Sequence, residues 1–168
     1  MDHEFFMNKA LEQAAAALQR GEFPVGCVMA YRSKVLVTGA RSRSGPQRQN
    51  ELDHAEMSAL RRLVDLDRPV ERGKVVVYST LEPCLMCYSA LIVNGLQKIV
   101  YAYEDVFGGG TDVDLTALRP FYRDRAVEIT PGVLRDKSRA LFNRFFSDPK
   151  NNYLKDTPLA QHALAGPS

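Results

Sequence analysis

Apolar residues recur along the chain with two different periods, and each period predicts a different kind of element. In residues 2–20, Leu11, Ala14, Ala15 and Leu18 repeat at three- and four-residue spacing, which predicts an amphipathic helix that ends at Gly21. Two short β-prone runs follow at residues 25–31 and 34–40. Because only two residues separate these runs, we expect a strand hairpin.

Farther along the chain, helical and strand-like segments alternate. The predicted helices cover residues 53–65, 83–95 and 130–146, with Pro83 as a first helical residue, and the predicted strands cover residues 74–80, 98–102 and 126–129. Strands that alternate with helices predict a mixed α/β layered domain. The apolar residues show no clear period after Asp148. We therefore expect a domain over residues 1–148 and a loosely ordered tail over residues 149–168.

Composition and net charge limit the classes of function that this chain can have. The chain has 168 residues, of which 45% are hydrophobic and 25% charged, as is ordinary for one globular domain. Twenty-two Lys and Arg against 20 Asp and Glu leave a net charge of +2, so a nucleic-acid partner would need a local patch. The loop at residues 41–50 is the most basic short stretch, and its Arg41, Arg43 and Arg48 are candidates for phosphate contacts.

The sequence shows neither an apolar run long enough for a membrane helix nor a basic head followed by an apolar run, as in a secretory signal. Its three cysteines make a poor disulfide framework, because one would be left over. We therefore expect a cytoplasmic protein and no membrane partner.

Two short motifs lie at predicted helix starts. They are His54-Ala55-Glu56 and, thirty residues later, Pro83-Cys84-Leu85-Met86-Cys87. Cysteines three residues apart on a first helical turn share a face, and the helix dipole lowers the pKa of a thiol placed there. His54, Cys84 and Cys87 are therefore candidate zinc ligands.

The number of ligands distinguishes a structural zinc site from a catalytic one. Structural sites close with four protein ligands, whereas catalytic sites keep a position for water. Neither His3, His162 nor Cys27 has ligand-like spacing to the other three candidates. We therefore expect one Zn²⁺ per chain with water in the fourth position, and Glu56 as the base that takes a proton from that water.

Each of these residues also has a structural interpretation. Asp53 and Glu56 fit a helix-capping box, and the two cysteines alone could form a redox pair. Cys27 is expected to be a small buried hydrophobic residue. Phe145 and Phe146 fit a core or pocket wall better than a surface on which bases stack.

The two motifs together resemble the signature of zinc deaminases, His-x-Glu followed by Pro-Cys-x-x-Cys. Over about residues 7–146 the chain is similar to the cytidine deaminase-like superfamily, and more closely to the bacterial tRNA adenosine deaminases. The similarity includes Glu22-Phe23-Pro24-Val25-Gly26-Cys27 and Thr80-Leu81-Glu82-Pro83-Cys84-Leu85-Met86-Cys87. Asp105 lies eighteen residues after the second cysteine of the motif, where the family has an aspartate in a loop that flanks the nucleotide.

The resemblance implies a three-layer α/β/α sandwich around a five-stranded mixed sheet, and a homodimer. It also implies that the backbone beside Ala55 recognises the base edge and that Val25 and Pro83 line the pocket. The chain departs from the family in having Arg41 where an asparagine binds the substrate, and in a loop before His54 that is about two residues longer. Arginine offers only hydrogen-bond donors, whereas an asparagine offers both donors and an acceptor. Arg41 would therefore bind different atoms of a substrate from those that the asparagine binds.

These features favour a hydrolase that deaminates an amino-substituted nucleobase, and adenosine in a tRNA anticodon loop is the leading substrate. A free base, a nucleoside or a related small heterocycle of the guanine or cytosine type is the alternative. Arg41 and a tail that is not basic motivate this alternative. A non-catalytic zinc-stabilised binding subunit and a dithiol redox protein are further alternatives from other classes.

Overall fold

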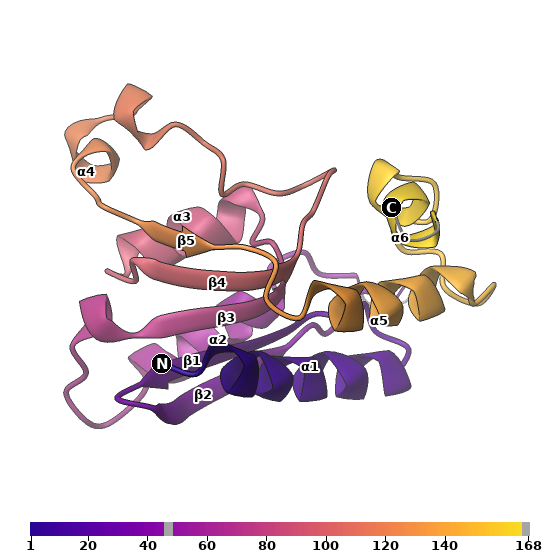
Figure 1. The fold of residues 1–168 in the computed structure, drawn as a ribbon, viewed down its shortest axis with the longest axis horizontal. Helices are drawn as coiled ribbons and strands as arrows, with labels where there is room; N and C mark the ends of the chain where they lie inside the picture. The colour runs from indigo at the N-terminus through magenta and orange to yellow at the C-terminus, as the bar shows by residue number, and fades with distance from the viewer. Residues whose placement is uncertain (46–48, 166–168) are drawn as a thin grey trace.

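The computed structural model describes residues 1–45 and 49–165, in which five strands form one mixed sheet with helices on both faces (Figure 1). The strands are β1 (Gly26–Tyr31), β2 (Lys34–Ala40), β3 (Val76–Leu81), β4 (Lys98–Tyr103) and β5 (Glu128–Thr130). Their order is β2-β1-β3-β4-β5, with β1 antiparallel to both neighbours and β3, β4 and β5 parallel. This is the predicted three-layer α/β/α sandwich.

Helices α1 (His3–Gln19) and α5 (Arg135–Ser147) lie on one face of the sheet, and α2 (Ala55–Val64) and α3 (Leu85–Val93) on the other (Figure 1). Alternate strand residues face the two layers, as the strand period requires. Val28 and Tyr78 pack in the core beneath α1, whereas Cys27, Met29 and Val77 belong to the core beneath α2 and α3. Shorter helices are η1 (Arg72–Lys74), η2 (Leu115–Ala117), α4 (Pro120–Arg123) and α6 (Pro158–Leu164).

The predicted hairpin between β1 and β2 is confirmed. Arg32 and Ser33 form its two-residue turn with φ angles of 49° and 58°. Positive φ at both central positions gives the turn a twist that matches the flanking strands. The pairing register shifts between Met29 and Ala30, where the ladder is irregular.

Three predicted helix starts are wrong by a few residues. Helix α2 begins at Ala55 and α3 at Leu85, because His54 and Cys84 hold extended backbone as the N-cap residues. Cys84 forms an isolated bridge with Gly109, which keeps it out of the helix. Leu134 has a φ of 56°, so α5 begins only at Arg135 and not near residue 130.

The segment after Asp148 differs from the loosely ordered tail that the sequence predicts. It carries α6, which Thr157 caps by accepting a hydrogen bond from the Ala160 N–H. Small and medium apolar side chains of α6 are buried in the same core cluster as the aromatic residues of α5. The sequence pattern misses this helix because seven residues are too few to show a helical period.

A cluster of three polar side chains, Glu104, Arg135 and His162, links α6 to the residue that follows β4. Glu104 accepts hydrogen bonds from Arg135 at 2.8 Å and from the His162 ring at 2.8 Å. Partial burial raises the pKa of Glu104, but the hydrogen bonds from Arg135 and His162 outweigh this and lower the pKa to about 2. The α6 segment is therefore a packed part of the fold (Figure 1). Across residues 1–45 and 49–165, no helix has the length and apolar character needed to span a membrane.

Gly39 sets how closely α2 approaches the sheet. A Cβ atom at this position would lie 2.1 Å from the Ala55 carbonyl oxygen and 2.7 Å from the Ala59 nitrogen. Gly39→Ala is expected to lower the free energy of unfolding by about 1–3 kcal/mol, because the helix must move outward to admit the methyl group. Urea denaturation measures this loss. Gly45→Ala is the control, since a Cβ there meets nothing within 4 Å; an equal loss in both variants would contradict the prediction.

Candidate active site

The N-termini of α2 and α3 meet beyond the carboxyl end of β3. His54 is the N-cap of α2, Cys84 is the N-cap of α3, and Cys87 lies in the first turn of α3. The carboxyl ends of parallel strands are where ligands bind in open α/β sheets. Helix N-termini also stabilise negative charge, which suits thiolates placed there.

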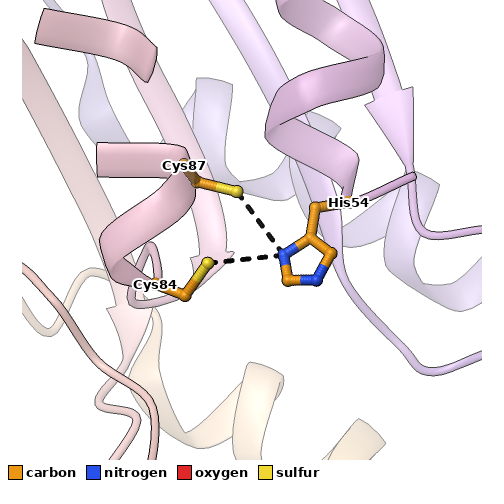
Figure 2. A group of neighbouring side chains, drawn as sticks. All are labelled: His54, Cys84 and Cys87. Carbon is orange, nitrogen blue, oxygen red and sulfur yellow. Dashed lines mark hydrogen bonds between the residues drawn. The ribbon is translucent and has the colours of Figure 1, made fainter. Parts of the chain in front are cut away.

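The His54 ring points its Nδ1 atom at both cysteine sulfurs (Figure 2). Nδ1 lies 3.6 Å from Cys84 Sγ and 3.4 Å from Cys87 Sγ, and the three ligand atoms lie within 4.8 Å of one another. Tetrahedral zinc with bonds of about 2.3 Å to sulfur and about 2.0 Å to nitrogen separates those atoms by about 3.5 Å. The three predicted ligands therefore fit zinc, and this group could hold a metal ion.

The two thiols of the group differ in their acidity. Hydrogen bonds from Cys87 and from His54 lower the pKa of Cys84 to about 4, against the effect of burial. The contact with Cys84, together with burial, raises the pKa of Cys87. These contacts thus favour a thiolate at Cys84, and a cation between the sulfurs would favour a second thiolate at Cys87.

Glu56 lies beside the cysteine pair in a closed environment. Its side chain is buried, Oε1 accepts a 2.7 Å hydrogen bond from Ser79 Oγ, and Oε2 lies 3.6 Å from Cys87 Sγ. Burial raises the pKa of Glu56, although the hydrogen bond from Ser79 opposes the shift. A carboxyl group with a raised pKa can both take up and return a proton near neutral pH.

The alternative that Asp53 and Glu56 form a capping box is not supported. No side chain caps α2 at its N-terminus. Asp53 instead accepts from Arg61 Nη1 at 3.0 Å and pairs with Arg43 Nε at 3.1 Å. Glu56 therefore has no capping partner and turns towards Ser79.

A cavity of about 60 Å³ opens beside this group. Of the residues predicted to contact substrate, Val25, Arg41, Ala55 and Asp105 line it, together with His54, Glu56 and Cys84. Pro83 is not among the lining residues; its carbonyl oxygen accepts a hydrogen bond from the Gly110 N–H. The cavity has room for a few water molecules or a flat ring that displaces them.

Five further residues line the cavity and were not predicted from the sequence. They are Phe23, Leu81, Glu82, Tyr153 and Leu154. Phe23, Leu81 and Glu82 lie inside the motifs that carry the family resemblance, so their positions contained a usable signal. Tyr153 and Leu154 follow the last long helix in a segment without periodicity, and only the folded chain brings them to the cavity.

Glu82 organises the loop that carries Asp105. Its Oε2 accepts from the Asp105 N–H at 3.2 Å, and its Oε1 accepts from Thr111 Oγ1 at 2.6 Å. Asp105 Oδ1 in turn accepts from the backbone N–H groups of Phe107 and Gly108. Burial raises the pKa of Asp105, although these two hydrogen bonds oppose the shift. Side-chain hydrogen bonds therefore hold the loop that carries Asp105 against the cavity.

Arg41 is fully buried, with 2% of its surface exposed. Nη1 donates to the carbonyl oxygens of Ser42 and Asn50, and Nη2 donates to Glu51 and Tyr153. Among residues 1–45 and 49–165, nothing accepts a hydrogen bond from its Nε–H. Burial therefore argues against a contact between Arg41 and a phosphate at the outer surface, whereas Arg43 is exposed but pairs with Asp53. Arg48 lies outside the described residues.

The other candidate ligands and ring residues lie elsewhere. His3 Nδ1 is 3.0 Å from Tyr78 Oη, His162 binds Glu104, and Cys27 is fully buried in the core. Phe145 and Phe146 are core residues, as predicted. In the part of the chain that the structure describes, no fourth His, Cys, Asp or Glu atom joins the three-residue group.

Comparisons with known proteins agree with this geometry. A family model for the cytidine and deoxycytidylate deaminase zinc-binding region matches residues 1–103. A tRNA-specific adenosine deaminase of Rickettsia typhi is 31% identical over 140 residues, which cover 83% of this chain and 95% of the relative.

Two solved structures extend the comparison. One comes from a study of A-to-I editing by tRNA:A34 deaminases at the wobble position; it has a TM-score of 0.66 and 25% identity, and the match covers 82% of this chain and 98% of that one. A guanine deaminase of Bacillus subtilis has a TM-score of 0.55 and 25% identity, over 62% and 66% of the two chains.

The three-residue group predicts which cysteines hold zinc. Cys87→Ala is expected to lose nearly all bound zinc, because it removes one of three protein ligands. Metal analysis of the protein after dialysis against buffer with trace zinc measures this. Cys27→Ala is the matched control and is expected to keep zinc, since Cys27 lies outside the group. Loss of zinc in both variants, or in neither, would show that the group is wrongly assigned.

Proposed function

The chain belongs to the cytidine and deoxycytidylate deaminase zinc-binding family, whose members are hydrolytic deaminases acting on C–N bonds, and we propose that it converts adenosine to inosine in a tRNA anticodon loop. The observation that carries the catalytic part is the buried Glu56 carboxyl group beside the His54, Cys84 and Cys87 group. The substrate is inferred from relatives named for tRNA adenosine deamination.

The proposed reaction replaces the amine on a ring carbon by oxygen from water, with release of ammonia. His54, Cys84 and Cys87 would hold one Zn²⁺ per chain, and the ion would supply Lewis-acid activation of water. Glu56 would take a proton from the attacking water and deliver it to the ring nitrogen, and Ser79 holds the Glu56 carboxylate in place by donating a hydrogen bond. Glu56 would then carry the remaining proton of the added hydroxyl group to the amine, which leaves as ammonia.

The cavity walls would hold the base in place. Val25 and Phe23 would supply apolar surface, and Ala55 would present backbone polar groups of the α2 N-terminus to the base edge. Asp105, on the loop that Glu82 fixes, would flank the attached sugar. The Arg41 Nε–H, which has no acceptor among the described residues, would be the donor open to a ligand.

A second candidate is deamination of a free base, a nucleoside or a related small heterocycle of the guanine or cytosine type. Three observations favour it. Arg41 stands where the resemblance implies an asparagine, and the fold is similar to that of a guanine deaminase. Tyr153 and Leu154 also enclose the cavity, which suits a small ligand.

Two further properties belong to the proposal. We expect a cytoplasmic enzyme, as suits a tRNA substrate. We also expect a homodimer, supported by large apolar side chains that α2 and α3 leave exposed, namely Val64, Leu85 and Val93.

Glu56→Gln is expected to lower turnover by a factor of about 10²–10⁴, because it removes the group that moves protons and keeps the side-chain shape. Ammonia release is measured with an adenosine-containing anticodon stem-loop and with a panel of free bases and nucleosides. Zinc content of the variant is the control. Normal turnover of zinc-loaded Glu56→Gln would refute the mechanism, and turnover of a small molecule alone would favour the second candidate.

Binding of the stem-loop is expected to depend on salt. Three or more phosphate contacts would weaken binding about tenfold or more between about 50 and 200 mM salt, since each contact releases counterions. Fluorescence anisotropy with a labelled stem-loop measures the dissociation constant, and a stem-loop with inosine at the target position controls for recognition of the amine. A flat salt response would count against an RNA substrate.

A further inference from the structure

The two nitrogens of the His54 ring face different partners. Nδ1 points at the sulfurs of Cys84 and Cys87 (Figure 2), so a metal ion held there would take the Nδ1 lone pair. In the neutral ring the proton must then sit on Nε2, which needs an acceptor. The Glu51 Oε2 atom lies 3.5 Å from His54 Nε2.

The Glu51 carboxylate is held on several sides. Oε2 accepts hydrogen bonds from Arg41 Nη2 at 3.0 Å and from Tyr153 Oη at 2.8 Å, and Oε1 accepts from Gln49 Nε2 at 2.8 Å. Although Glu51 is half exposed to solvent, Arg41 is buried. The Arg41 guanidinium is fixed in turn by the carbonyl oxygens of Ser42 and Asn50. The carboxylate is thus preorganised next to the His54 ring.

We propose that Glu51 is a positioning residue for the metal ligand His54, with Arg41 and Tyr153 holding its carboxylate in place. A carboxylate that accepts the second ring N–H of a metal-bound histidine fixes the ring tautomer and orientation and strengthens the ligand. This inference rests on the zinc site of the proposed function and is independent of which base is deaminated.

The same arrangement accounts for two departures from the family pattern. Arg41 replaces an asparagine, and the longer loop before His54 contains Glu51. In the fold these two residues form an ion pair of 3.0 Å. Tyr153, which lies more than a hundred residues farther along the chain, donates a hydrogen bond to the Glu51 carboxylate of this ion pair. The three residues are one unit that ties the C-terminal segment, through Glu51, to the metal ligand.

Zinc affinity tests this proposal without reference to the substrate. Glu51→Gln keeps the side-chain size and one acceptor oxygen but loses the charge, and it is expected to weaken zinc binding about tenfold; Glu51→Ala is expected to weaken it up to about a hundredfold. Competition with a chromogenic chelator measures the affinity. The visible absorption bands of the cobalt-substituted protein are expected to shift in both variants, because the His54 ring changes its orientation.

A matched control separates positioning from a general loosening of the loop. Glu22→Gln removes a carboxylate that accepts from Ser44 and Arg43 and does not contact His54. It is expected to keep zinc affinity within about twofold of wild type. Tyr153→Phe removes one of the donors that hold Glu51, and it is expected to weaken zinc binding less than Glu51→Gln does, because Arg41 still holds the carboxylate.

The outcomes distinguish this proposal from the proposed function. If Glu51→Gln, folded by circular dichroism, binds zinc as wild type does and leaves the cobalt spectrum unchanged, the positioning role is overturned. An equal loss in Glu22→Gln would overturn it too, because the effect would then come from the loop. A wild-type protein that binds no zinc would overturn both this inference and the proposed catalytic site.

Discussion

The close approach of α2 to β2 over Gly39 is the constraint on which the site depends. A side chain there would collide with the Ala55 carbonyl and push the start of α2 outward. The position of that start decides where His54 and Glu56 lie relative to Cys84 and Cys87. Metal ligands tolerate displacements of only a few tenths of an ångström. The packing of Gly39 against the α2 backbone therefore controls whether His54 can lie within ligand distance of the two cysteines.

Helix ends supply much of the electrostatics of the site. His54 and Cys84 are the N-cap residues of α2 and α3, and the positive end of a helix dipole favours negative charge there. That field suits a Cys84 thiolate, whereas Glu56 is buried deeply enough for its pKa to rise. Neighbouring groups whose pKa values shift in opposite directions can divide the work of binding a cation and moving a proton.

The cavity is built from segments that are far apart in the chain. Val25 comes from the approach to β1, Ala55 from α2, Asp105 from the loop after β4 and Tyr153 from the segment before α6. Each segment is fixed by a polar contact of its own, such as Glu82 with the Asp105 loop and Glu51 with Tyr153. The aromatic packing of α5 against Phe23 and α6 holds the last of these segments in place.

The sequence by itself determined the layered α/β fold and predicted the His54, Cys84 and Cys87 group and the proposed base Glu56, because periodicity and short motifs are local properties of the chain. Only the tertiary structure decided that residues 149–165 pack as part of the fold, that Tyr153 lines the cavity, and that Arg41 binds Glu51 and is shielded from phosphate. These contacts join residues up to 112 positions apart, and no local pattern encodes such a distance. Burial and pairing of a charged side chain depend on what surrounds it after folding.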